Sequence, residues 1–184
     1  MAEAGEIRTD DLDAEREARR RVALAQIRQY PDPVLRMRAH EVDEFDDDLA
    51  KLAERMTSLM GEAAGVGLAA NQVGVLKRLF VFQPAGEEEA RAVVNPEIVE
   101  RGDETEPEDE GCLSMQGVLV SVERNLRVTL QASDLAGDDV RLELEGMAAR
   151  VVQHELDHLD GVLIIDRTTP EGRREALGVL RQAV

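Results

Sequence analysis

The sequence predicts an α+β fold in which mixed or antiparallel sheets pack around one central helix. Apolar and polar residues alternate over 126–132 and 140–144, as expected for strands with one buried face. The segment 147–161 instead carries apolar residues at helical spacing and follows those strands directly. Strands grouped ahead of a helix, rather than alternating with helices, favour an α+β over an α/β architecture.

The chain is expected to form one domain. Its 184 residues are enough for a single hydrophobic core and short for two, and 43% of them are hydrophobic. No internal repeat or linker interrupts residues 29–184. Residues 1–28 are dominated by charge and are interpreted as a solvated N-terminal extension. Within it, 11–25 could form a helix of alternating charges, with apolar anchors at Val22, Leu24 and Ile27.

Charge and composition exclude several kinds of partner. A net charge of −17 would repel a phosphate backbone and 2% aromatic residues provide no stacking platform, so no direct DNA binding is expected. The N-terminus is too acidic for a secretory signal, and no apolar run reaches membrane-spanning length. The one cysteine, Cys112, cannot form an internal disulfide, which is typical of a reducing interior. A cytoplasmic protein without membrane association is therefore expected.

Local signals place the first helical segments. Pro31 and Pro33 enforce extended backbone, and a short helical turn is expected after Pro33. A helix is predicted from Asp47, because apolar residues recur at helical spacing up to Met60 and acidic residues precede it. Gly61 is interpreted as the stop of this helix.

Extended segments are predicted at 78–83, 92–99, 126–132 and 140–144. Pro96 lacks an N–H group, which assigns the second of them to a sheet edge. The acidic residues 100–110 are interpreted as a loop. After the central helix, 162–165 is predicted to be extended, and Thr169 is expected to cap a last helix with Pro170 in its first position.

The central helix carries the strongest chemical signal, an H-E-x-x-H pattern beginning at His154. His154 and His158 are one helical turn apart and project to the same side, where they could bind one divalent metal ion. Glu155 could handle protons on a water molecule bound to that metal. The pattern should arise by accident in about one in a hundred chains of this length, and two of the three histidines lie here. It is therefore predicted to be a metal-binding helix.

Met147 and Val151 extend the histidine stripe, which is expected to face the core, and Gly161 occupies a C-cap position. A catalytic metal has three protein ligands and one open position. The candidates for the third ligand are Cys112, His40 and the carboxylates. Cys112 follows a glycine in a turn between strands, where a lone cysteine is more often a small core residue. His40 has no partner at ligand spacing and is interpreted as a surface or capping residue.

The segment 65–74 combines two glycines with small residues, a pattern that allows close approach of backbone. A phosphate-binding loop is excluded, because no Lys-Ser/Thr follows and no third glycine has dinucleotide-binding spacing. Gln72 is a polar group in this mainly apolar run. It is either a buried amide with satisfied hydrogen bonds or a donor to a ligand.

The chain resembles the peptide deformylase family at three motifs. They are GVGLAANQ at 65–72, EGCLS at 110–114 and QHELDHLDG at 153–161, in that family's order and with similar spacing. The resemblance runs from about residue 30 to about residue 165. It implies a peptide deformylase-like fold for residues 29–184.

The resemblance implies one divalent metal ion per chain, held by Cys112, His154 and His158. Ferrous iron is the usual native ion, and Zn²⁺, Ni²⁺ or Co²⁺ also suit these ligands. The implied activity is removal of the formyl group from the N-terminal formylmethionine of newly made polypeptides. The implied partners are N-formylmethionyl peptides and nascent chains, met at the ribosome, and a monomer is expected.

The resemblance also implies roles for individual residues. A metal-bound hydroxide would attack the formyl carbon, with Glu155 as general base and acid. The side-chain amide of Gln72 and the backbone N–H of Leu113 would stabilise the oxyanion. The remaining assignments are substrate binding by Val66, Gly67 and Val151, and structural support by an ion pair between Glu110 and Arg124.

The sequence departs from the family pattern at one position, and two alternative functions stay open. Gln116 precedes a glycine where the family usually has proline, which would loosen the loop beside Leu113 and alter substrate preference. A zinc peptidase would share the H-E-x-x-H helix but would take a His or Glu as third ligand and cut internal peptide bonds. A non-catalytic binding domain would keep the fold without turnover.

Overall fold

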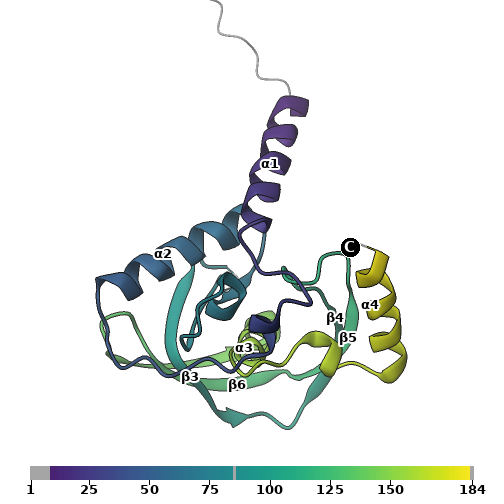
Figure 1. Ribbon diagram of the computed structural model, residues 1–184. Helices are drawn as coiled ribbons and strands as arrows, with labels where there is room; N and C mark the ends of the chain where they lie inside the picture. The colour runs from purple at the N-terminus through teal and green to yellow at the C-terminus, as the bar shows by residue number, and fades with distance from the viewer. Residues whose placement is uncertain (1–8, 85, 183–184) are drawn as a thin grey trace, which may run out of the picture.

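Two antiparallel sheets lie beside a helix that runs through the middle of the protein, α3 (Gly146–Leu159) (Figure 1). The computed structural model describes residues 9–84 and 86–182. In this part of the chain the strands are β1 (Gly67–Ala69), β2 (Leu79–Phe82), β3 (Arg91–Arg101), β4 (Thr105–Glu110), β5 (Val120–Asn125), β6 (Arg127–Ser133) and β7 (Asp139–Glu145). The other helices are α1 (Thr9–Leu24), α2 (Asp47–Glu62) and α4 (Pro170–Gln182), with short 3₁₀ turns at Pro33–Arg36, Ala70–Val73 and Ile164–Asp166. The predicted α+β class is confirmed.

The larger sheet has the order β1-β2-β3-β6-β7, with all neighbours antiparallel. The prediction that 92–99 forms an edge is wrong, because β3 lies between β2 and β6. Asn95 and Pro96 form a bulge, with a register shift between Val94 and Glu97 and a φ of +50° at Asn95. A proline without an N–H group is tolerated there because the bulge interrupts the ladder.

The smaller sheet pairs β4 with β5, so the prediction of a loop over 100–110 is wrong for 105–110. The acidic side chains of β4 are exposed, and Glu110 at its end is the buried exception. An exposed two-stranded ribbon does not require apolar residues at alternate positions. The composition of 105–110 therefore does not predict that this segment pairs with β5. This hairpin is important because its connection, 111–119, carries Cys112.

Helix boundaries follow the capping signals with small differences. Asp46 Oδ1 accepts the Leu49 N–H at 2.9 Å and begins α2. The helix continues past the predicted stop at Gly61 and ends at Glu62, and Ala64 then adopts a φ of +56°. Thr169 Oγ1 accepts the Gly172 N–H at 3.1 Å, as predicted for the cap of α4. The predicted extended piece at 162–165 is wrong at its end, where the 3₁₀ turn Ile164–Asp166 forms.

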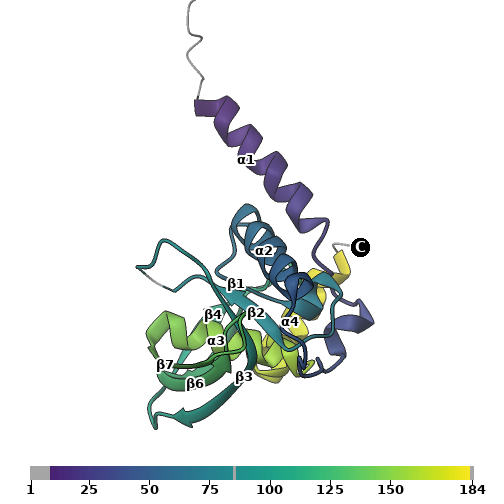
Figure 2. The same ribbon diagram turned by 90° about the vertical axis from the view of Figure 1, so that its left-hand side faces the viewer.

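The N-terminal helix α1 projects from the body, and its C-terminal end packs against α2 (Figures 1 and 2). Ala23, Leu24 and Ile27 are buried in a cluster with α2 residues. The prediction that Val22 is an apolar anchor is wrong, because its side chain is 61% exposed on the outer side of the helix. The first eight residues of the predicted extension lie outside the described part of the chain.

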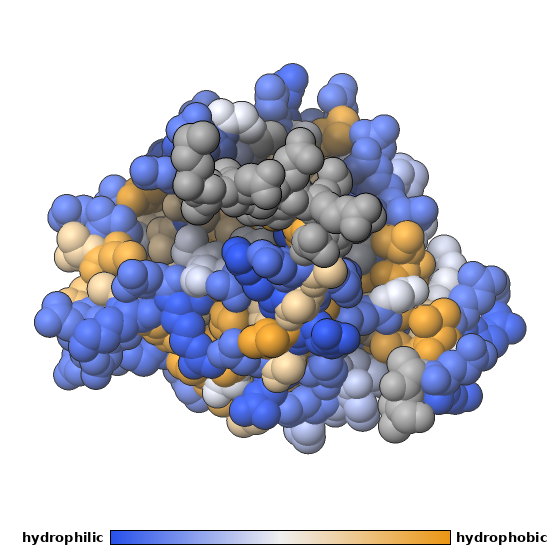
Figure 3. Space-filling view, turned by 90° about the horizontal axis from the view of Figure 1, so that it is seen from above, coloured by the Kyte–Doolittle hydropathy of each residue, from blue (hydrophilic) through white to orange (hydrophobic). Residues whose placement is uncertain are grey.

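Three apolar clusters hold these elements around α3. One joins α2 to β1 and β2, a second fills the space between the larger sheet and α3, and a third lies between β5, the 3₁₀ turns and α4. Seen from above, hydrophilic residues surround smaller hydrophobic areas (Figure 3). Within residues 9–84 and 86–182, none of the helices has the length and apolar character needed to cross a bilayer.

Candidate active site

Cys112, His154 and His158 converge from two elements on one point. Cys112 lies in the connection after β4, and both histidines lie on α3. The Cys112 Sγ is 3.2 Å from His158 Nε2, and the two histidine Nε2 atoms are 3.2 Å apart. All three ligand atoms lie within 4.8 Å of one another. His40, another of the candidates, is exposed, forms an isolated backbone β-bridge with Lys77 and is not part of this cluster.

The spacing of this cluster fits a divalent metal ion. Tetrahedral coordination with ordinary bond lengths requires about 3.3 Å between two nitrogen ligands and about 3.6 Å between nitrogen and sulfur. Two of the three observed separations are 3.2 Å, within about 0.4 Å of these values, and the remaining pair, Cys112 and His154, lies within 4.8 Å. Imidazole and thiolate ligands suit iron, zinc, nickel and cobalt alike, so the donor set defines a class of metals and not one metal.

Local structure explains how α3 presents the two histidines. The i, i+4 spacing places them on one side of the helix, and Gly161 ends it with a φ of +74°. A Cβ atom at Gly161 would lie 2.5 Å from the carbonyl oxygen of Arg36, so the turn after α3 excludes other residues. The side-chain amide of Asn71 donates to the carbonyl oxygen of His158 and attaches this end of α3 to the turn that carries Gln72.

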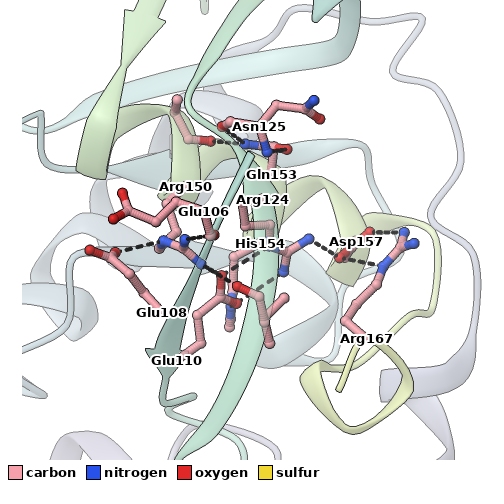
Figure 4. A network of polar contacts seen from close by, with 12 residues as sticks. Glu106, Glu108, Glu110, Arg124, Asn125, Arg150, Gln153, His154, Asp157 and Arg167 are labelled. Atoms are coloured by element: carbon pink, nitrogen blue, oxygen red, sulfur yellow. Dashed lines mark hydrogen bonds and ion pairs between the residues drawn. The ribbon is translucent and has the colours of Figure 1, made fainter. Parts of the chain in front are cut away.

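A buried carboxylate holds His154 in position (Figure 4). His154 Nδ1 donates to Glu110 Oε2 at 3.1 Å, which directs Nε2 toward the cluster. Arg124 donates to both oxygens of Glu110 at 2.9 and 3.0 Å, and Arg150 Nη1 donates to Oε1 at 2.9 Å. Burial raises the pKa of Glu110, but hydrogen bonds from His154 and Arg124 outweigh it and lower the pKa to about 2. Glu110 therefore stays ionised.

Arg150 attaches α3 to both strands of the smaller sheet. Besides Glu110, its guanidinium contacts Glu108 Oε2 at 2.9 Å and the carbonyl oxygens of Val122 and Glu106 at 2.8 and 2.7 Å (Figure 4). Its side chain is only 7% exposed. Sequence reasoning missed this residue, although a charge one turn before His154 on the buried side of a helix requires a buried partner.

Arg124 extends the same network to the C-terminal half of α3. It donates to Asp157 Oδ2 at 2.6 Å, and Asp157 in turn contacts Arg167 at 2.5 Å (Figure 4). Sequence reasoning assigned no role to Asp157. Positive and negative charges alternate along the network, so each buried charge has an opposite partner.

Glu155 lies beside the cluster and against the backbone of β1. It is 3% exposed, and a Cβ atom at Gly67 would lie 2.8 Å from its carboxyl carbon. Gly67 is therefore required for this placement of the carboxylate. Gln72 is also buried, and its Oε1 accepts the Ala69 N–H at 2.8 Å. That bond turns its NH₂ group toward Ser114 Oγ at 3.0 Å and Cys112 Sγ at 3.7 Å.

Burial and hydrogen bonding shift the pKa values of these groups. The pKa of Glu155 is raised to about 7, chiefly because burial disfavours the carboxylate. Burial also lowers the pKa of His158 well below 6.5, which keeps its imidazole neutral and able to bind a metal. Burial lowers the pKa of His154 too, but hydrogen bonds with Cys112 and Glu110 raise it well above 6.5. A metal ion bound here would displace that proton.

An open cavity of about 630 Å³ leads to the cluster. Its lining includes Val66, Gly67, Gln72, Cys112, Leu113, Val151, His154 and Glu155, so the residues expected to bind substrate lie together. Val66, Leu119 and Met147 also line it and are 54%, 71% and 55% exposed. The prediction that the stripe of Met147 faces the core is therefore wrong for Met147, because the stripe continues along this cavity.

Fold and site together define an α+β protein with a candidate mononuclear metal centre of one cysteine and two histidines below an open cleft. The sequence model of the polypeptide deformylase family matches residues 24–174. The chain therefore belongs to the polypeptide deformylase family of enzymes. The match also confirms the family that the three motifs indicate.

Individual members of the family are similar to this protein over most of its length. A peptide deformylase of Thermotoga sp. (strain RQ2) is 51% identical over 150 residues, which cover 82% of this chain and 90% of the relative. Peptide deformylase 1 of Corynebacterium efficiens is 44% identical over 162 residues, covering 87% and 96%. The crystal structure of a peptide deformylase from Legionella pneumophila is similar with a TM-score of 0.81 at 39% identity, covering 85% of this chain and 92% of that one.

Proposed function

We propose that this protein is a metal-dependent hydrolase that removes the formyl group from the N-terminal formylmethionine of newly made polypeptides. Membership of the polypeptide deformylase family supports the reaction. The observation that carries the metal dependence is the convergence of Cys112, His154 and His158 beside the buried Glu155. The substrates of this reaction are water and the formylated peptide. The proposal includes a cytoplasmic monomer that meets nascent chains at the ribosome.

The metal centre would consist of Cys112, His154 and His158 with one divalent ion, Fe²⁺ natively. When bound, such an ion lowers the pKa of water and polarises a carbonyl oxygen, which provides a nucleophile near neutral pH. Glu110 would keep His154 oriented for this role, because its carboxylate holds Nδ1 at 3.1 Å.

Glu155 would act as the general base and then as the general acid. Its pKa of about 7 allows the carboxylate to accept a proton and the carboxyl group to return it near neutral pH. Water adds to the formyl carbon while Glu155 takes its proton. The bond between the formyl carbon and the methionine nitrogen then breaks, and Glu155 delivers the proton to the leaving amine, which yields formate and a free N-terminus.

Two donors would stabilise the negative charge that develops on the formyl oxygen. The NH₂ group of Gln72 faces the cluster, because Ala69 N–H holds its Oε1 on the other side. Leu113 follows Cys112 directly and lines the cavity, and its backbone N–H would be the second donor. Each donor of this kind typically contributes about 10²–10³ in rate.

The substrate peptide would bind along β1. Among the residues that the structure describes, this strand pairs with β2 alone. Val66 and Gly67 line the cavity, so the other edge of β1 could receive an added strand there. The methionine side chain would enter the apolar part of the cavity beside Val151 and Met147. Gln116 also lines this cavity, so the departure from the family pattern lies where substrate preference would be decided.

Formate release from a formyl-Met-Ala-Ser peptide tests this function, using protein purified anaerobically and assayed for metal. We expect about one metal ion per chain and formate formed together with free amine. Cys112→Ala should lose the metal and the activity. Normal metal content in Cys112→Ala, or cleavage of an internal bond in an acetylated peptide, would favour a general zinc peptidase. Metal binding without formate would favour the non-catalytic domain.

A further inference from the structure

The N-terminal helix α1 contributes a side chain to the cleft. Almost all of α1 precedes residue 24, where the match to the family begins. Nevertheless Arg20, near the C-terminal end of α1, lines the same cavity as Cys112 and Glu155. Arg20 Nε also donates to the carbonyl oxygen of Ala63 at 3.4 Å, which holds the side chain at the end of α2.

The backbone from Gly67 to Ala63 connects the reaction centre with Arg20. Gly67 contacts Glu155, and Gly65 lies against the side chain of Leu113. Ala63 then carries the carbonyl group that Arg20 contacts. An extended peptide advances about 3.3 Å per residue. The backbone itself turns at Ala63 and Ala64, but Glu155, Gly65 and Arg20 all line one cavity. A substrate with its formyl end at Glu155 that continues along this lining would reach Arg20 with a residue beyond the methionine, which we take to be the third or fourth.

The guanidinium of Arg20 forms no strong ion pair at this position. Its side chain is 46% exposed, and its carboxylate neighbour Glu17 is 3.9 Å away and 67% exposed, a pair of little strength. The other arginine of the cavity, Arg150, is buried in ion pairs. The protein carries a net charge of −17, and Asp109 also lines the cavity, so without Arg20 the mouth would repel acidic peptides.

We propose that Arg20 is a specificity-determining residue that favours formylated peptides with Asp or Glu at the third or fourth residue. The inference rests on the proposed deformylase function. It assigns to α1, outside the family match, a role in choosing among substrates. The interaction is exposed, so it changes preference by a modest factor and weakens as salt screens it.

The test compares kcat/KM for formyl-Met-Ala-Glu-Glu, formyl-Met-Ala-Gln-Gln and formyl-Met-Ala-Lys-Lys amides. In the wild type at low salt we expect the acidic peptide to be used about three- to fivefold better than the basic one, which corresponds to an exposed ion pair. Arg20→Ala should reduce this ratio to about one or below, mainly through KM. Arg20→Lys should retain most of it, and 0.5 M NaCl should abolish it in the wild type.

Arg19→Ala is the matched control, because Arg19 is on the same helix, is 71% exposed and pairs with Glu15 instead. It should leave the ratio unchanged. A ratio that survives Arg20→Ala, or that falls equally in Arg19→Ala, would overturn the role of Arg20. If the neutral peptide releases formate and the three peptides show equal kcat/KM, this inference is overturned and the proposed deformylase function is not. No release from any of the three peptides would overturn the proposed function and this inference with it.

Discussion

A Cβ atom at Gly67 would lie 2.8 Å from the carboxyl carbon of Glu155 and closer still to its Oε1. Strand β1 thus limits where the buried carboxylate can be, and the limit comes from a backbone position without a side chain. Because a general base must lie within hydrogen-bond reach of the proton it takes, this contact would connect Gly67 to the rate of the proposed reaction.

We expect Gly67→Ala to lower kcat by about 10²-fold or more, because the added methyl group displaces the Glu155 carboxylate. Metal content should remain normal, since the three atoms nearest to the new methyl group all belong to Glu155 and none to a candidate metal ligand. Gly61→Ala is the control: nothing lies within 4 Å of a Cβ there, and its kcat should be that of the wild type. Normal turnover in Gly67→Ala would show that Glu155 needs no such placement.

Glu155→Gln should keep the metal and lose turnover by about 10²–10⁴-fold, because the amide cannot accept the proton from water. The side chain has nearly the same shape and remains buried, so the melting temperature should not fall. Metal content and kcat measured on the same preparation check this. Retained turnover at wild-type rates would exclude Glu155 as the general base.

Arg150→Met should lower the free energy of unfolding by about 3 kcal/mol, because it leaves the buried Glu110 carboxylate and the carbonyl oxygens of Val122 and Glu106 with fewer partners. It should also weaken metal binding about 10- to 100-fold, since Glu110 orients His154. Denaturant unfolding and competition with a chelator measure the two effects.

The control for Arg150 is Arg141→Met, whose side chain is 53% exposed and lies 3.8 Å from Glu100. Its free energy of unfolding should change by at most about 0.5 kcal/mol. If Arg150→Met unfolds at the same denaturant concentration as Arg141→Met, the contacts of Arg150 with the smaller sheet contribute nothing to the free energy of unfolding.

Asp166→Asn should destabilise the protein by about 1 kcal/mol at pH 7, and the difference from the wild type should shrink below about pH 4. Burial raises the pKa of Asp166, but hydrogen bonds from Arg36, Leu163 N–H and Arg173 lower it below its ordinary 3.8. A depressed pKa in the folded state means that the unfolded state binds the proton more readily. The stabilisation is therefore complete above pH 3.8 and is lost as pH falls through the lower, folded value.

Denaturant unfolding of both proteins between pH 3 and pH 7 measures this pH dependence. Glu145→Gln removes an exposed carboxylate, 79% accessible, and provides the comparison. A constant difference between wild type and Asp166→Asn across that range would show that Asp166 is not stabilised as its contacts with Arg36 and Arg173 indicate.

Several parts of the fold were predictable because they depend on neighbouring residues. Alternation predicted β6 and β7, helical spacing predicted α2 and α3, and Thr169 capped the last helix as expected. The strand β4 was not predictable from its acidic composition, because its stability depends on pairing with β5. The central place of β3 was also missed, because a bulge at Pro96 overrides the rule that proline belongs at an edge.

The sequence by itself determined the spacing of His154 and His158, the adjacent Glu155 and the family motifs, because these depend on residues close together in the chain. Residue chemistry alone left the third ligand open among Cys112, His40 and the carboxylates. Only the tertiary structure decided that the Cys112 sulfur, 46 residues before His158, lies 3.2 Å from its imidazole. That distance depends on the pairing of β4 with β5 and on the buried arginines that join them to α3, and neither is a property of a local segment.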